Sequence, residues 1–389
     1  MRYCLLTRKL LFIYAIQSVC GGTAFYISLF LNGHAQLNPV QIGLALSLGS
    51  AGNIAGGYIG GFLCDKFNAS YNLRIGLLIQ GSALFSLIFL QKYEHILIIM
   101  MLMGFGSYLY VTSSNYILNS KFNIDQQNRT KIISDQHIIS NIGMFLAAIL
   151  MGYSTDGYYS VIFAAISITL VVIAILIKPF SQTNFEEKGY ESSHLDNFLV
   201  NNYLYLLGIG TIGVVGLLFA SHRIGFPIYL DENFGNISTG FLMALNPLII
   251  LLFQKTIIRF STKNEVLSIA IGLALFALSF LTLNFSPTFL IVLLSIVFLT
   301  VGEILTVTHA QSVAFGFAPK NKRGKIIGLY KATYSLTKVC GSYCSGIIIQ
   351  NYSYGHLWGM SSCLGIVGGL LVLNYYKSNI NLYGIYEKT

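Results

Sequence analysis

The sequence contains few charged residues. Only 10% of its 389 residues are Asp, Glu, Lys or Arg, and 54% are hydrophobic, whereas about a quarter of a soluble globular protein is charged. This shortage excludes an ordinary water-soluble enzyme. The short alternating runs of an outer-membrane barrel are lacking too. The chain has instead long apolar stretches, of the about 20 residues that an α-helix needs to cross a bilayer.

Several chemical motifs are also missing. No G-x-x-x-x-G-K-[ST] phosphate loop occurs, which argues against ATP-driven transport. The six cysteines lack paired metal-ligand spacing apart from Cys340 and Cys344, so we expect no metal and no cofactor. The net charge of +9 is dispersed along the chain, which does not fit a nucleic-acid-binding protein. Histidines are scattered rather than clustered, which disfavours a membrane enzyme.

Twelve apolar stretches predict an all-α membrane protein with twelve transmembrane helices. The stretches divide into two sets of six around the longest hydrophilic segment, residues 181–202. We therefore expect a six-helix bundle over residues 1–180, a linker over 181–202 and a second bundle over 203–389. The expected spans are residues 10–30, 40–64, 73–90, 96–118, 138–154, 160–177, 203–226, 240–258, 266–283, 289–315, 326–349 and 357–376.

The distribution of basic residues predicts the topology. Basic residues near span ends are retained on the cytoplasmic side of a membrane. The two termini, the linker and every second connection hold almost all of the Lys and Arg residues outside the spans, and the opposite connections hold only Lys92. We therefore expect both termini and the linker in the cytoplasm, in a multi-pass protein of a bacterial cytoplasmic (inner) membrane. Two parallel halves are typical of secondary transporters, whose substrate site lies between them.

Two motifs resemble those of the major facilitator superfamily. The segment Gly60, Gly61, Phe62, Leu63, Cys64, Asp65, Lys66, Phe67 and Asn68, followed by Arg74, resembles the loop after helix 2. The series Gly302, Glu303, Ile304 and Leu305, then Ala318, Pro319, Arg323, Gly324 and Gly328, is similar to the helix 10 to 11 pattern of multidrug-efflux-like and peptide-transporter-like members. Helix 1 lacks the charged cluster of the peptide symporters. The resemblance therefore implies the twelve-span, multidrug-efflux-like branch.

The resemblance also implies a gate. Its gating motif consists of Gly61, Asp65, Lys66, Arg323 and Gly324. Gly52, Gly56 and Gly60 lie on one face of the second span and allow a neighbouring helix to approach closely. In the superfamily this face slides against helix 11, here residues 326–349. Asp65 and Arg323 also have simpler interpretations, as a solvated loop acid and a topology charge.

Ionisable residues inside a bilayer are costly, so each is a candidate for function. Glu303 falls in the middle of a span, and three basic residues fall within spans: Arg223, Lys331 and Lys338. The tenth and eleventh expected spans, residues 289–315 and 326–349, run in opposite directions, so Glu303 and Lys338 lie at similar depth. We expect them to form an ion pair, which is either static or broken by substrate or a proton. Burial favours the neutral carboxyl group and imidazole changes charge near neutral pH, so Glu303 and His309 are the proton-coupling candidates.

The excess of buried positive charge predicts an anionic substrate. Arg223, Lys331 and Lys338 are the candidate ligands, because arginine binds carboxylates in a bidentate manner and lysine supplies a point charge. The first half supplies neutral candidates, which also fit interhelical hydrogen bonding: Tyr14, Gln17, Tyr26, Tyr108 and Asn115.

We therefore expect a monomeric secondary transporter, working by alternating access. Its predicted function is proton-coupled export of a small organic anion, with a polycarboxylate siderophore as the most specific version. The alternatives are a proton-coupled importer of an anionic nutrient and a general multidrug exporter. A receptor that binds without transport also fits the sequence. Substrate counterflow in proteoliposomes separates it from a transporter.

Overall fold

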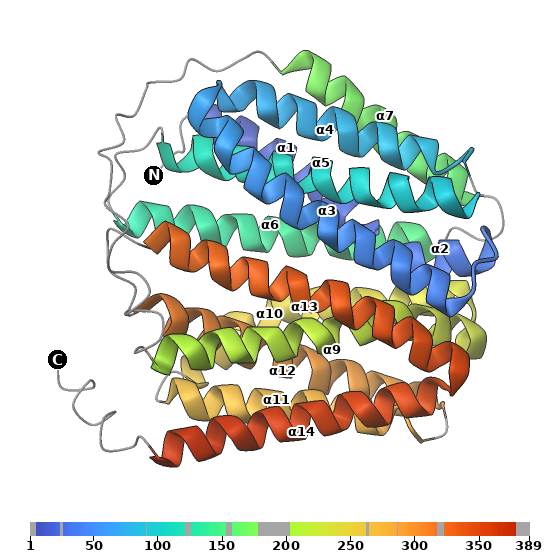
Figure 1. The fold of residues 1–389 in the computed structure, drawn as a ribbon, viewed down its shortest axis with the longest axis vertical. Helices are drawn as coiled ribbons and strands as arrows, with labels where there is room; N and C mark the ends of the chain where they lie inside the picture. Colours follow the sequence, from blue (N-terminus) through green and yellow to red (C-terminus); the bar gives the residue numbers. More distant parts are fainter. Residues whose placement is uncertain are drawn as a thin grey trace. The chain divides into compact units, whose positions relative to one another are not determined.

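The computed structural model describes residues 5–23, 26–90, 92–120, 126–152, 158–177, 203–261, 264–285, 287–316 and 323–378. These residues form thirteen α-helices and no strand (Figure 1). The expected linker at 181–202 lies outside the described residues.

Each expected span coincides with a helix, and the first is divided into two. In the first half of the chain the helices are α1 (Leu5–Thr23), α2 (Ile27–Gly33), α3 (Pro39–Lys66), α4 (Ala69–Ser86), α5 (Tyr93–Ser120), α6 (Gln126–Gly152) and α7 (Tyr158–Leu176). The second half contains α9 (Tyr203–Phe234), α10 (Asn236–Ser261), α11 (Glu265–Thr282), α12 (Phe289–Gly316), α13 (Arg323–Asn351) and α14 (Tyr354–Ser378).

Eight of these helices are long and apolar enough to cross a bilayer by themselves. A ninth span is formed if α1 and α2, which are bent by 41° at their break, count together. Among the described residues, α4, α6 and α13 contain no stretch that is both long and apolar enough. Helix α13 carries Lys331 and Lys338 within its length, and α6 begins with a polar segment, so their mean hydropathy is lower. The helical fold is confirmed, and the number twelve stays a prediction.

Asparagine side chains fix the start of several helices. The Asn38 side chain accepts a hydrogen bond from the Gln41 backbone (2.9 Å), the Gln41 side chain bonds back to Asn38, and Pro39 occupies the first helical position of α3. Such a capping box satisfies backbone N–H groups that have no partner within the helix. Asn68 and Asn264 cap α4 and α11 by a single bond each, with their side chains accepting from the Ser70 and Leu267 backbone N–H groups.

The described residues belong to two compact units. Unit 1 contains Met1–Glu187, Arg223–Leu251 and Ser342–Gln350, and unit 2 contains Lys188–His222, Leu252–Gly341 and Asn351–Thr389. Helices α9, α10 and α13 therefore contribute to both units. The reason is that one end of each of these helices packs on helices from the first half of the chain.

The glycines of α3 face a different helix from the one that the resemblance implied. Methyl groups on Gly52 and Gly56 would overlap the carbonyl oxygens of Met101 and Phe105, so the glycine face of α3 packs tightly on α5. The contact of α3 with α13 lies nearer its start, where a methyl group on Gly43 would come within 2.7 Å of the Ser342 carbonyl oxygen. The expectation that Gly52, Gly56 and Gly60 face the eleventh expected span, residues 326–349 in α13, is therefore wrong, because α5 occupies that face.

This packing predicts opposite effects for two substitutions in one helix. Gly52→Ala adds a methyl group where the α5 backbone leaves no room, and overpacking costs about 1–3 kcal/mol. Gly61→Ala adds the same group where no atom lies within 4 Å, and alanine favours a helix by about 1 kcal/mol. We expect Gly52→Ala to lower the melting temperature of the detergent-solubilised protein and Gly61→Ala to leave it unchanged or raise it. Equal losses in the two variants would contradict the assigned face.

Candidate functional site

A network of buried polar side chains connects α1, α4 and α5 within unit 1. Gln17 is 5% exposed, and its amide nitrogen lies 3.2 Å from the Ser107 hydroxyl and 3.4 Å from the Gln80 amide oxygen. The Gln80 amide nitrogen in turn contacts the Cys20 sulfur (3.2 Å). Gln17, expected as a substrate ligand, is therefore engaged with two neighbouring helices of its own unit, α4 and α5, which fits the alternative of interhelical hydrogen bonding.

The other neutral candidates of the first half also contact protein groups. The Tyr14 ring stacks on Tyr110 with 6.4 Å between centroids. The Asn115 side-chain oxygen accepts a hydrogen bond from Gln136 (3.1 Å). Tyr108 is half-buried beside Gly57. Tyr14 and Tyr108 keep partial exposure, which leaves them the better placed of these candidates for a ligand.

Helices from both halves of the sequence meet in unit 1. The buried Tyr26 hydroxyl donates a hydrogen bond to the Gly240 carbonyl oxygen (3.3 Å), and the Ser28 hydroxyl donates to that of Arg223 (3.1 Å). Gly152 and Gly240 are in such close contact that a methyl group on either would overlap the other's Cα. The α1–α2 break, the end of α6, the start of α10 and the later part of α9 thus form one packed cluster.

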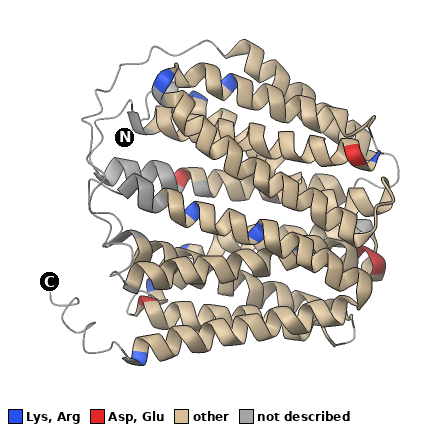
Figure 2. Cartoon of the chain, in the orientation of Figure 1, with Lys and Arg blue, Asp and Glu red and all other residues tan. Residues whose placement is uncertain are grey.

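The charged residues of the helices are sparse, and α13 carries basic residues within its length (Figure 2). Lys338 lies near the middle of α13, is half-buried, and places its ammonium nitrogen 5.1 Å from the centroid of the Tyr334 ring. This distance is typical of a cation–π contact. Lys331, two turns earlier on the helix, is exposed, and Arg223 on α9 is half-buried.

The two proton-coupling candidates occupy different places on α12. Glu303 lies near the middle of the helix and is half-buried. His309 is only 2% exposed and lies near the helix end, where its Nε2 is 2.8 Å from the Ser261 hydroxyl and its Nδ1 is 3.9 Å from a carboxylate oxygen of Glu265. Sequence reasoning had not included Ser261 and Glu265, which approach His309 because the ends of α10, α11 and α12 meet.

The expected gating motif is described in part. Lys66 places its ammonium nitrogen 4.3 Å from the Phe62 ring centroid, and Gly61 has no atom near its missing side chain. The side chains of Asp65, Arg323 and Gly324 lie outside the described residues. Arg74, also part of the motif segment, donates a hydrogen bond from Nε to the carbonyl oxygen of Ala174 (2.8 Å). A cation there is favourable, because the C-terminal end of a helix such as α7 carries partial negative charge.

No group of three or more metal-ligating side chains occurs among the residues that the structure describes. The cysteines that the structure describes form no disulfide bond, and of these Cys20 and Cys64 are buried.

Comparison with known proteins decides the family. The model of the Major Facilitator Superfamily matches residues 10–336 and, in a second match, 209–380. The chain belongs to this superfamily. Together with the apolar helices, the match makes the protein a multi-pass membrane transporter rather than an enzyme.

Individual relatives agree with this assignment. The uncharacterized MFS-type transporter YttB of Bacillus subtilis (strain 168) is 25% identical over 336 residues, which is 84% of this chain and 83% of YttB. A Na(+), Li(+), K(+)/H(+) antiporter of Planococcus maritimus is 22% identical over 89% of this chain and 88% of its own. The crystal structure of the nucleoside transporter NupG superposes with a TM-score of 0.78 at 16% identity, covering 96% of this chain and 99% of NupG, which shows a shared fold.

Proposed function

We propose that this transporter couples the proton gradient to export of a small organic anion, such as a polycarboxylate siderophore, through alternating access of two six-helix bundles. In this proposal the bundles span residues 1–180 and 203–389. The chain is a monomer of the multidrug-efflux-like branch that crosses the bacterial cytoplasmic membrane twelve times, with both termini in the cytoplasm.

The observation that carries the proposal is Lys338. A lysine near the middle of a membrane-spanning helix costs free energy, so its position calls for a role. Lys338 is half-buried, and its ammonium nitrogen lies 5.1 Å from the centroid of the Tyr334 ring, a distance typical of a cation–π contact. In the proposal, a carboxylate substrate binds near this ammonium group through charge attraction. Arg223 and Lys331 are proposed as further anion ligands, with Tyr14 and Tyr108 as neutral ones.

The proposed proton coupling uses Glu303 and His309 on α12. Glu303 lies near the middle of α12, as Lys338 does in α13, and the proposal places the two residues close enough for protonation of Glu303 to change the field at Lys338. A proton on Glu303 removes a negative charge near Lys338, and a bound anion adds one. Competition between these two charges would link proton movement to substrate movement.

The packed cluster of unit 1 supports alternating access. It closes one end between helices of the two sequence halves through the contacts of Tyr26, Ser28, Gly152 and Gly240. The small residues Gly152 and Gly240 allow the helices at this end to pack closely. The hydrogen bonds of Tyr26 and Ser28 to backbone carbonyl oxygens can break during the proposed cycle. In the proposed topology this end faces away from the cytoplasm.

Monovalent cation and proton exchange is the second candidate. It is favoured by the likeness to the Planococcus maritimus antiporter and would use Glu303 as the cation ligand. Import of an anionic nutrient and general multidrug export differ from the first proposal in direction and in substrate charge. Transport assays in proteoliposomes separate all of these.

We expect Lys338→Ala to lower proton-driven transport of radiolabelled citrate in proteoliposomes by about tenfold or more, since a lost charge-assisted interaction is worth about 1.5–3 kcal/mol. Lys377→Ala, at the exposed end of α14, is the matched control and keeps the wild-type rate. Wild-type rates in Lys338→Ala would refute the anion site. Exchange of Na⁺ or K⁺ for protons without citrate transport would favour the second candidate.

We expect Glu303→Gln to stop accumulation of citrate against its gradient while citrate exchange across the membrane continues. The neutral amide keeps the shape of the side chain but cannot release a proton. The test compares net proton-driven transport with counterflow in the same vesicles. Loss of both activities in a variant that still folds would show that Glu303 is part of substrate binding, and loss of folding would indicate a static ion pair.

A further inference from the structure

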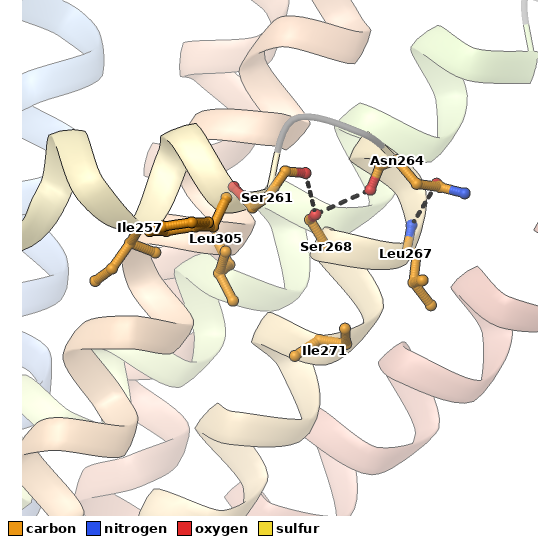
Figure 3. Close-up of a pocket in the computed structure, with 8 residues that line it drawn as sticks. Ile257, Ser261, Asn264, Leu267, Ser268, Ile271 and Leu305 are labelled. Carbon is orange, nitrogen blue, oxygen red and sulfur yellow. Dashed lines mark hydrogen bonds between the residues drawn. The ribbon is translucent and has the colours of Figure 1, made fainter.

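The ends of α10, α11 and α12 enclose a groove in unit 2 that the proposed substrate site does not use. Its cavity volume is about 450 Å³, and Figure 3 shows Ser261, Asn264 and Ser268 at one side of it and Ile257, Ile271 and Leu305 toward the other. The Ser268 hydroxyl lies within hydrogen-bond distance of the backbone carbonyl oxygens of Ser261 and Asn264 (2.8 and 2.9 Å) and donates its one hydrogen to either or shares it between them. These bonds hold the end of α10 next to the start of α11.

One ring nitrogen of His309 forms a hydrogen bond with Ser261 at the end of α10. The Ser261 hydroxyl donates its single hydrogen to the Ile258 carbonyl oxygen (3.0 Å). Its oxygen must therefore accept the hydrogen bond that joins it to His309 Nε2 at 2.8 Å. A hydroxyl has only one hydrogen to give, so this geometry assigns the hydrogen of the neutral imidazole to Nε2.

The other ring nitrogen of His309 lacks a hydrogen-bond partner among the described residues. Nδ1 is buried, and the nearest charged atom is the Glu265 carboxylate oxygen at 3.9 Å. That same oxygen accepts a hydrogen bond from the Ser312 hydroxyl (2.6 Å). With the neutral imidazole, a lone pair on Nδ1 thus faces the lone pairs of a carboxylate. An unpartnered buried polar atom costs about 1–3 kcal/mol, and one added proton would remove this cost.

Other ionisable groups occur on the helices around this pair. They are Tyr205 on α9, Lys255 and Arg259 on α10, Glu303 on α12, Lys331 on α13, and Tyr376 and Lys377 on α14. Tyr376 accepts a hydrogen bond from Asn264 (2.7 Å), next to Glu265 in the chain. Lys263, in the connection from α10 to α11, lies outside the described residues. Glu265 is the carboxylate that comes within 4 Å of the imidazole.

We propose that His309 Nδ1 and the Glu265 carboxylate form a proton-binding site that ties α12 to the start of α11. Glu265 is 39% exposed and His309 is 2% exposed, so a proton from water reaches the carboxylate first and is then shared with Nδ1. Binding changes the net charge of the pair from −1 to zero and creates an N–H···O bond. No other bond forms or breaks.

This site deepens the proposed function, and its role in transport rests on that function. Proton binding at the ends of α10, α11 and α12 would stabilise one arrangement of these helices, and proton release would loosen it. His309 would therefore act with Glu265, at a helix end, rather than with Glu303 in the middle of α12. The proton site itself is tested without any substrate, so its failure is distinguishable from failure of anion transport.

The first test compares melting temperatures of the purified full chain between pH 8 and pH 5. Glu265→Gln supplies an amide N–H to Nδ1 at every pH, so at pH 8 we expect this variant to melt higher than wild type by about 1–2 °C, a small shift because the shift falls as the chain lengthens. As the pH falls, wild type binds the proton and the difference disappears. His356→Gln, at an exposed histidine on α14 bonded to Ser353, is the control and changes with pH as wild type does.

The second test observes the imidazole directly by ¹⁵N NMR of the wild-type protein. We expect a neutral ring with its hydrogen on Nε2 at pH 8 that becomes an imidazolium in acid. The resonance is assigned by its loss in His309→Gln or, if that variant does not fold, by its shift in Ser261→Ala. A constant difference between wild type and Glu265→Gln from pH 8 to pH 5, or a His309 ring that stays neutral throughout, would overturn the proposal.

Discussion

The cost of placing charge inside a bilayer governs this protein. A charged side chain in the middle of a membrane-spanning helix is retained only where a protein group, water or a ligand compensates it. Here the compensation differs from site to site. Lys338, near the middle of α13, lies on an aromatic face. Arg74 and Glu265, near the starts of α4 and α11, instead donate a hydrogen bond to the Ala174 carbonyl oxygen and accept one from the Ser312 hydroxyl, respectively. The proposed anion and proton sites are built on such charged groups within or at the ends of the helices.

Close helix contacts provide the rigid frame around these sites. Gly52 and Gly56 allow the backbones of α3 and α5 to touch, and Gly152 and Gly240 do the same for α6 and α10. In lipid, such contacts replace the hydrophobic driving force that packs helices in water. The first contact lies within the first half of the sequence and the second joins the two halves. In the proposed transport cycle the first contact persists and the second opens.

The sequence predicted the helices well because long apolar runs have few alternatives in a bilayer. The expected span 40–64 lies within α3, whose start at Pro39 is fixed by the Asn38 cap that the structure shows. The sequence did not predict the break between α1 and α2, the polar beginning of α6, or the partner of the α3 glycine face. A glycine stripe indicates that some helix packs closely but carries no information about which one. The choice of α5 depends on contacts between segments far apart in the chain.

The candidate site was harder to anticipate for the same reason. Residue type and depth in a helix selected Glu303, His309 and Lys338, and their roles in transport stay predictions. Depth alone does not reveal that Gln17 bonds to Gln80 or that Ser261 and Glu265 approach His309. Glu265 lies at a helix start and resembles an ordinary N-terminal acid. Only the packing of α11 against α12 identifies it as the partner of a buried imidazole.

Ligand-dependent melting of the purified protein tests the central claim, that a cationic site in the second half of the chain binds an organic anion. The account predicts that citrate and related polycarboxylates raise the melting temperature of wild type, that their neutral esters do not, and that Lys338→Met removes the shift. Stabilisation by Na⁺, K⁺ or hydrophobic cations, with none from polycarboxylates, would contradict it.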